Sequence, residues 1–167
     1  NSITVLDADL VTIIETFTGR KVKQVRLSGG GSISQAALIA CDDGPSIFAK
    51  WNHEAPEGFF GAEAFGLKEM ALTPEVKTPA VFFIQDRPCK GPPCILLEAF
   101  QPVAKTKAAE AILGQQLAAL HSVTAPEFGF REDNFIGLTP QFNAPATRWD
   151  EFFIERRLRQ QIELGEK

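Results

Sequence analysis

The sequence has 167 residues, of which 44% are hydrophobic and 23% charged, enough for one ordinary domain or for two small lobes with a buried core. Its net charge is −4 and its basic residues are scattered, which argues against nucleic acid or an anionic membrane as the main partner. The longest apolar stretches are too short to span a bilayer, and no signal peptide is visible.

The first predicted element is a helix over residues 7–18. Its apolar side chains recur at intervals of three and four residues, which places them on one face. Asp7 is a suitable N-cap for this helix, and Gly19 is a suitable residue to end it. The next segment, 21–27, is rich in residues that favour strands, so the chain is expected to begin with a helix and a strand.

Three consecutive glycines, Gly29, Gly30 and Gly31, follow this strand. Two apolar runs, 36–41 and 46–51, come next and are joined by Asp-Asp-Gly-Pro, a combination that predicts a β-hairpin. The glycines therefore lie between two strands. Glycine lets a backbone approach an anion closely, but the run matches neither the Walker A pattern nor G-x-G-x-x-G. A plain turn therefore remains an alternative to a phosphate-binding loop.

The rest of the chain is predicted to hold further helices and strands. They are a helix over 57–71, strands over 80–85 and 95–100, and helices over 107–122 and 149–164. The apolar stripe of Ile112, Leu113, Leu117 and Leu120 predicts that the third helix packs into a core. Residues 123–148 are rich in turn formers and are expected to be irregular. Strands followed by helices are typical of an α+β fold, here with a lobe boundary at 101–104.

Two charged residues occupy positions that the apolar pattern assigns to the core. Lys50 interrupts an apolar strand, and Glu63 lies on the same helical stripe as Phe60 and Leu67. Opposite charges at such positions on neighbouring elements are expected to pair. Because desolvation offsets the attraction in a buried pair, Lys50 is better explained if it also serves a ligand such as a nucleotide phosphate. The alternatives are a purely architectural ion pair and an edge lysine that reaches solvent.

The three cysteines are Cys41, Cys89 and Cys94, an odd number that is not typical of a secreted disulfide framework. Cys89 and Cys94 bracket a Pro-Gly turn between two apolar runs. They are interpreted either as a reversible disulfide or half of a metal site, or as two ordinary thiols at a hairpin tip.

The order of glycine loop, strand lysine, helix glutamate and apolar strand resembles the small lobe of the protein-kinase-like fold. The segments 128-FGFREDNFIGLTPQFN-143 and 149-WDEFFIERRLRQQIEL-164 are more specific and resemble the fructosamine (ketosamine) kinase family, which is related to the aminoglycoside and choline phosphotransferases. The resemblance covers nearly the whole chain. It implies an α+β fold in which residues 1–100 form a kinase-like N-lobe, with a mostly antiparallel sheet of about five strands and one packed helix. Residues 101–167 would form the first helices of a truncated C-lobe.

The resemblance also implies residues that bind ATP. Lys50 would contact the α- and β-phosphates, and Glu63 would orient Lys50. The backbone of the glycine loop would cover the phosphates, and the hinge between the lobes would lie against the adenine. The loop residues are Gly29, Gly30, Gly31 and Ser32, and the hinge residues are Glu98, Ala99, Phe100 and Gln101. The family reaction is the ATP-dependent phosphorylation of a sugar hydroxyl on a ketosamine, a small-molecule substrate.

The family places its catalytic base in an H-G-D-L-W-x-G-N loop and a metal-binding aspartate in a D-P segment, and neither string occurs here. No catalytic residue and no Mg²⁺ ligand is therefore assigned, and both are expected beyond Lys167. We accordingly expect an N-terminal fragment of a cytoplasmic ketosamine kinase, inactive on its own. A lobe face left exposed in such a fragment also predicts self-association.

Two alternatives stay open on the sequence. The first is another small-molecule kinase of the same fold, acting on aminoglycosides or choline-like alcohols. The second is a non-catalytic binding module that keeps the same architecture. The coding sequence after Lys167 distinguishes a kinase from a module, because a kinase would continue into an H-G-D-type loop and a module would end in a stop codon.

Overall fold

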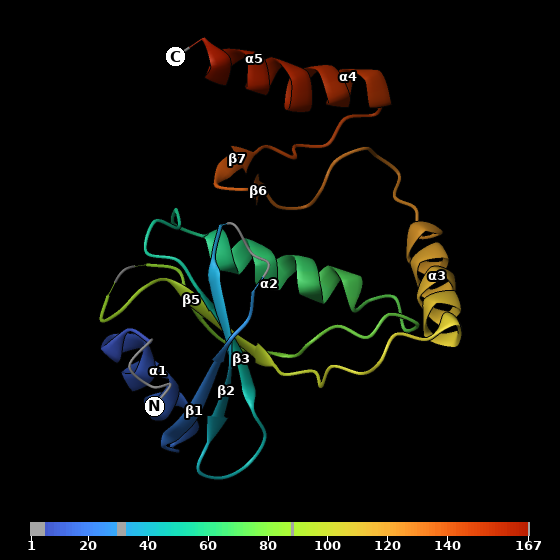
Figure 1. Ribbon diagram of the computed structural model, residues 1–167. Coiled ribbons are helices and arrows are strands. Elements are labelled where there is room, and N and C mark those ends of the chain that lie inside the picture. Colours follow the sequence, from blue (N-terminus) through green and yellow to red (C-terminus); the bar gives the residue numbers. More distant parts are fainter. Residues whose placement is uncertain (1–5, 30–32, 88, 167) are drawn as a thin grey trace.

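The computed structural model describes residues 6–29, 33–87 and 89–166 of the chain. Figure 1 shows the longer strands gathered below α2, with a short hairpin and the last helices above it. The elements in chain order are α1 (Ala8–Thr18), β1 (Val22–Leu27), β2 (Gln35–Cys41), β3 (Ile47–Trp51), α2 (Phe59–Met70), β4 (Val81–Gln85), β5 (Cys94–Glu98), α3 (Lys107–His121), β6 (Asn134–Ile136), β7 (Thr139–Gln141), α4 (Trp149–Phe153), the π-helical segment η2 (Ile154–Leu158) and α5 (Arg159–Gly165).

The five longer strands form one sheet in the order β1-β2-β3-β5-β4, and each neighbouring pair is antiparallel. The hairpin predicted from Asp-Asp-Gly-Pro joins β2 to β3. Gly44 in its turn has a φ of 72°, a conformation that favours glycine. The glycine run lies in the connection between β1 and β2. The predicted α+β fold with a five-stranded antiparallel sheet is therefore confirmed.

Alternating side chains give the sheet two apolar faces. On one face, α1 packs against the strands through Leu10 and Ile14, which are fully buried. On the other face, α2 packs through Phe60 and Ala64. Each face therefore has its own small core, and a side chain on the α2 face of a central strand lies within reach of α2.

The predicted caps of the first helix are both present. The Asp7 side chain accepts a hydrogen bond of 2.8 Å from the backbone N–H of Asp9, which satisfies a donor at the start of α1. Gly19 follows the helix in the left-handed conformation, with a φ of 66°, and its N–H donates to the carbonyl of Glu15. Local sequence signals thus set both ends of α1.

The second half of the chain differs from the prediction in two places. Residues 123–148 are not irregular throughout, because β6 and β7 pair as a short antiparallel hairpin. The predicted helix over 149–164 is present but widens in its middle into η2. There the backbone N–H of Arg159 donates to the carbonyl of Ile154, five residues earlier, which is the bonding pattern of a π-helix.

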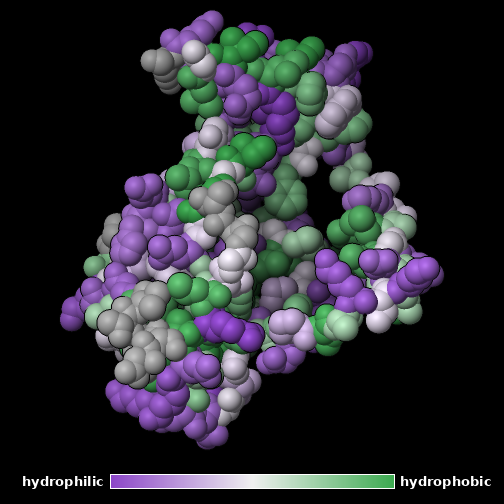
Figure 2. Space-filling view, in the orientation of Figure 1, coloured by the Kyte–Doolittle hydropathy of each residue, from purple (hydrophilic) through white to green (hydrophobic). Residues whose placement is uncertain are grey.

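The prediction that the third helix packs into a core is wrong within the part of the chain that the structure describes. No residue of α3 is buried: Ile112, Leu113 and Leu117 are 53%, 64% and 48% exposed, and Leu120 is half-buried. The amphipathic pattern is real, but α3 stands to one side of the other elements and none of them covers its apolar stripe (Figure 1). Figure 2 shows further apolar atoms over the last helices, at the top of the view. None of the described helices combines the length and apolar character that a bilayer span requires.

Candidate functional site

Lys50 and Glu63 meet on the face of the sheet that α2 covers. The alternation of β3 turns Lys50 to this face, while its neighbour Ala49 is buried on the α1 side. The Lys50 Nζ lies 2.7 Å from each of the two Glu63 carboxylate oxygens. The two side chains remain 29% and 27% exposed, so the ion pair is only partly buried. The structure thus brings together the two charges that the sequence singled out.

The glycine segment is tied at its far end to the residue that follows β3. The Asn52 side-chain amide donates a hydrogen bond of 2.8 Å to the carbonyl of Ile33. Gly29 lies in open space, because a Cβ added there would meet no atom within 4 Å. Packing inside the chain therefore does not require glycine at this position. The other predicted loop residues, Gly30, Gly31 and Ser32, lie outside the described residues.

The predicted hinge begins at Glu98, the last residue of β5. Its carboxylate accepts a hydrogen bond of 3.2 Å from the backbone N–H of Ala80 and lies 3.7 Å from the Lys77 Nζ. The same ammonium stands 4.7 Å from the ring centroid of Phe100, which is 45% exposed. Within the described residues, no hydrogen bond engages the backbone of residues 99–101. These N–H and C=O groups are available to a ligand, while Lys77 holds the Glu98 carboxylate and the Phe100 ring.

A cavity of 210 Å³ lies between the sheet and the start of the linker after β5. The register pairs Leu38 of its wall with Phe48, which lies two residues before Lys50 on the same side of β3. The cavity and the Lys50–Glu63 pair therefore share one face of the sheet. Its lining residues are Gln24, Arg26, Leu38, Ala40, Ser46 and Gln101. Of the predicted hinge residues, Gln101 is the one that reaches this cavity.

Asp86 supports α2 and was missed by the sequence reasoning. The N-cap of α2 is Gly58, which has no side chain to cap the helix. Asp86, just after β4, supplies the acceptor instead, taking hydrogen bonds of 2.9 and 3.0 Å from the N–H groups of Phe60 and Gly61. A Cβ on Gly61 would lie 2.6 Å from the other Asp86 oxygen. The available signal was indirect, since a helix that begins at glycine needs an acceptor from elsewhere.

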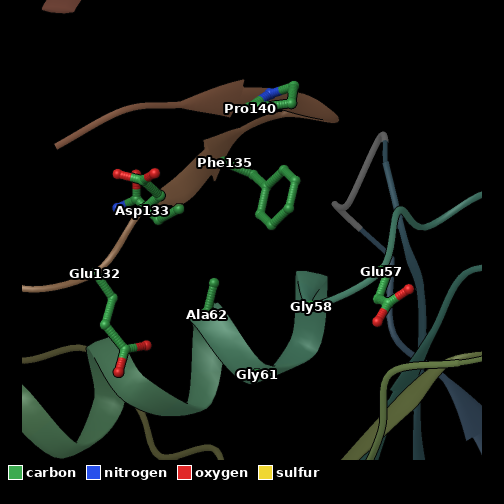
Figure 3. Close-up of a pocket in the computed structure, with 9 residues that line it drawn as sticks. Glu57, Gly58, Gly61, Ala62, Glu132, Asp133, Phe135 and Pro140 are labelled. Atoms are coloured by element: carbon green, nitrogen blue, oxygen red, sulfur yellow. The ribbon is translucent and has the colours of Figure 1, made fainter.

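A second cavity, of 410 Å³, lies between the first turns of α2 and the hairpin β6–β7. Figure 3 shows the Phe135 ring directed from β6 toward α2, with the Glu57 and Glu132 side chains on opposite sides of the view. The lining residues are Glu57, Gly58, Gly61, Ala62, Glu132, Asp133, Asn134, Phe135 and Pro140. Glu132 and Asp133, both exposed, give one wall of this cavity an acidic character.

Metal and thiol chemistry have little structural support in the described residues. No cluster of three or more His, Cys, Asp or Glu side chains there is arranged to hold a metal ion. All three cysteines are free, with Cys89 exposed and Cys94 buried. Burial raises the pKa of the Cys94 thiol to about 11, which keeps it protonated at neutral pH.

Comparisons with known proteins relate this site to one enzyme family. The sequence profile described as fructosamine kinase matches residues 7–167. A chloroplastic protein-ribulosamine 3-kinase of Arabidopsis thaliana is 34% identical over 147 residues, which cover 87% of this chain and 44% of the relative. The chain therefore spans less than half the length of this relative.

Two solved structures share the fold, and both bear a provisional assignment as fructosamine-3-kinase. The protein from Haemophilus somnus 129PT has a TM-score of 0.77 at 25% identity, over 94% of this chain and 53% of that one. The protein from Thermobifida fusca YX-ER1 has a TM-score of 0.74 at 29% identity, over 95% of this chain and 56% of that one. With the family profile matched along nearly its whole length, this chain belongs to the fructosamine kinase family.

Proposed function

We propose that this chain provides the nucleotide-binding lobe of an ATP-dependent kinase that phosphorylates a sugar hydroxyl of a ketosamine. The observation that carries the proposal is the partly exposed Lys50–Glu63 pair, on a sheet face that also holds a cavity beside the hinge. The substrate class follows from family membership and from the name of the Arabidopsis relative. Residues 1–100 would form the nucleotide lobe, and residues 101–167 would begin the helical substrate lobe.

The residues present fit a nucleotide. Lys50 offers a point charge for phosphate, and Gly29, which lies in open space, leaves room for a ligand beside the backbone. Leu38, which lines the cavity, and its cross-strand neighbour Phe48 offer apolar contacts for a purine ring. At the hinge, Ala99 and Phe100 have unpaired backbone groups that can bond the edge of the ring.

The proposed roles follow from this geometry. Bound ATP supplies the phosphoryl group that is transferred. Glu63 holds the Lys50 ammonium at a fixed point, so that its charge is already in place for the α- and β-phosphates. The loop of Gly29, Gly30, Gly31 and Ser32 covers the phosphates and excludes water. The hinge of Glu98, Ala99, Phe100 and Gln101 fixes the ring and therefore the direction in which the phosphates point.

In the full-length enzyme, nucleotide binding and phosphoryl transfer would depend on different segments of the chain. No residue of this chain matches the catalytic base or the metal-binding aspartate that the family resemblance implies, so no Mg²⁺ ligand is assigned here. The 167-residue chain would therefore bind nucleotide without transferring phosphate. A coupled assay for ADP release checks this, and sustained turnover by the isolated chain would contradict it.

A cytoplasmic location is also part of the proposal. It is supported by three free cysteines, one of them exposed, which suit a reducing compartment. The Arabidopsis relative is named as chloroplastic, so the location of this protein has to be determined directly. Cell fractionation of the native protein is the test, and recovery with an organelle would contradict the cytoplasmic assignment.

The nucleotide role is tested by titrating MgATP into Lys50→Ala and a control, Lys68→Ala. Lys68 is exposed on α2 and is expected to leave binding unchanged. Loss of the Lys50 charge should weaken binding by about tenfold or more, because charge-assisted contacts contribute roughly 1.5–3 kcal/mol. Calorimetry gives the affinities directly. Equal affinity in both variants would overturn the nucleotide role of Lys50.

The substrate class is tested on the full-length protein that contains this segment. Lysine carrying a ribulosamine or fructosamine adduct is offered beside an aminoglycoside and choline, each with MgATP. Phosphorylation of the ketosamines, detected as a mass increase on the sugar, is the expected result. Preference for the aminoglycoside or choline would reassign the substrate while leaving the nucleotide site intact.

A further inference from the structure

The segment before the last helix is organised around Asn143, which is 1% exposed. Its side-chain N–H groups donate to the Glu132 carbonyl at 3.0 Å and to the Asn134 side chain at 2.9 Å. Its backbone N–H donates to the Asp133 carboxylate at 2.7 Å, and its carbonyl accepts from the Phe130 N–H at 3.0 Å. One buried side chain therefore ties together both sides of the hairpin β6–β7.

The remaining polar atom of Asn143 is bonded by Arg157. The Arg157 guanidinium donates to Asn143 Oδ1 at 2.6 Å and to the carbonyl of Phe142 at 2.8 Å. Its Cζ also lies 4.6 Å from the ring centroid of Phe152. Desolvation lowers the pKa of Arg157 somewhat, which reflects how closely the protein surrounds this charge. Arg157 thus fastens the last helix to the hairpin.

Arg157 lies within η2, where the helix departs from α-helical bonding. The wider turn brings the Arg156 carbonyl to 2.9 Å from the Arg157 guanidinium, as a third acceptor. π-Helical segments of this kind occur mostly as single insertions and are frequent at functional sites. The π-helical distortion thus coincides with Arg157, the residue that contacts Phe142 and Asn143.

The hairpin fastened in this way packs on α2. The Phe135 ring lies 5.4 Å from that of Phe59, and the rings of Phe130 and Phe65 are likewise 5.4 Å apart. At the far end of α2, Arg131 forms an ion pair with Glu69. These contacts are spread along α2 from Phe59 to Glu69, and Phe59 also packs against the cluster between α2 and the sheet.

Glu63 is placed between these contacts and the sheet. It lies one turn after Phe59 on α2 and three residues after Phe60, which packs on the sheet. The sheet fixes how closely α2 approaches β3. The hairpin contacts α2 as well, and the rotation of α2 about its axis determines where the Glu63 carboxylate lies relative to Lys50.

We propose that Arg157 is a positioning residue for nucleotide binding: through Asn143 it locks the hairpin onto α2 and so holds Glu63 against Lys50. This inference rests on the proposed function, because it assigns Arg157 an effect on the same nucleotide site. Arg157 touches neither Lys50 nor Glu63 and acts through the hairpin and α2.

The test compares MgATP affinity and amide hydrogen exchange in Arg157→Ala and Arg157→Lys. The lysine variant keeps the charge but loses the planar fork that reaches two acceptors at once. The control is Arg159→Ala in the same helix, where the arginine pairs with exposed Glu155. All measurements are made well below the unfolding temperature of each variant, so that global unfolding does not contribute.

Both Arg157 variants are expected to weaken MgATP binding between about twofold and thirtyfold, the range typical of coupling through packed elements. Exchange should rise in α2 as well as in the hairpin, and should stay unchanged in α1, which packs on the other face. Arg159→Ala should behave as the unmodified protein. If Arg157→Ala does not fold, the lysine variant decides the question alone.

A purely local role for Arg157 predicts a different result. Stability would fall and exchange would rise between Phe130 and Leu158, while MgATP affinity and exchange in α2 stayed as in the unmodified protein. That outcome overturns the positioning role and leaves the proposed function standing. If Lys50→Ala also binds MgATP normally, the nucleotide site itself is wrong and the positioning role falls with it.

Discussion

Replacing Asp86 by alanine is expected to destabilise the protein by about 2–3 kcal/mol. The Asp86 carboxylate accepts two hydrogen bonds at the start of α2, one of them from the N–H of Phe60, which is fully buried. Loss of a capping acceptor costs about 0.5–2 kcal/mol, and a buried donor left without a partner costs about 1–3 kcal/mol. The two terms overlap, because they describe the same N–H groups, and the carboxylate also loses an interaction with the helix dipole of about 0.3–1 kcal/mol.

Urea unfolding of Asp86→Ala, Asp86→Asn and a control measures this loss. The asparagine variant keeps an acceptor oxygen and loses the charge, so we expect it to cost about 1 kcal/mol or less. Glu75→Ala removes an exposed carboxylate from the loop after α2 and should shift stability by less than about 0.5 kcal/mol. A loss below about 0.5 kcal/mol for Asp86→Ala, or equal losses for alanine and asparagine, would refute the reasoning.

Glu15, the cysteines and α3 can each be tested by a single measurement. The pKa of Glu15 is lowered, chiefly by its hydrogen bond from Lys21. The stability that Glu15 contributes is therefore fully present above the ordinary pKa of 4.5 and is lost as the pH falls through the lowered pKa. Glu15→Gln should therefore flatten the acid limb of a urea-unfolding series, and an unaltered limb would contradict this. Iodoacetamide at about pH 8 should alkylate exposed Cys89 well before Cys94, because Cys94 is buried and its pKa is raised to about 11. Mass spectrometry of the peptides measures the two rates, and equal rates would count against burial of Cys94. The uncovered stripe of α3 should cause concentration-dependent association in light scattering, which Leu113→Glu should reduce; a monomer at all concentrations would exclude this association.

The parts of the fold that depend on local patterns could be predicted from the sequence. The N-cap Asp7 and the terminating Gly19 are adjacent to the helix they bound, so no tertiary information was needed. Strand alternation likewise placed Lys50 among apolar neighbours, and helical spacing placed Glu63 on a buried stripe. Each of these signals acts over a few residues.

The features that were missed depend on contacts between distant residues. The strands β6 and β7 have three residues each and include Pro140, so neither shows a usable period. Asn143 is bonded by residues 132–134 before it and by Arg157 after it, and the local composition does not reveal these partners. For α3, the period correctly predicted a helix with an apolar stripe, but the period does not say which element covers that stripe.

The close approach of Gly61 to Asp86 has a consequence for how this family can vary. A methyl group at position 61 would lie 2.6 Å from Asp86 Oδ2, so a side chain there requires Asp86, the acceptor that starts α2, to shift. The two positions, 25 residues apart, are therefore constrained to change together. A homologue with a side chain at position 61 is expected to have another acceptor for the N–H groups at the start of α2. Paired substitution at these positions across homologues would be the evolutionary record of that constraint.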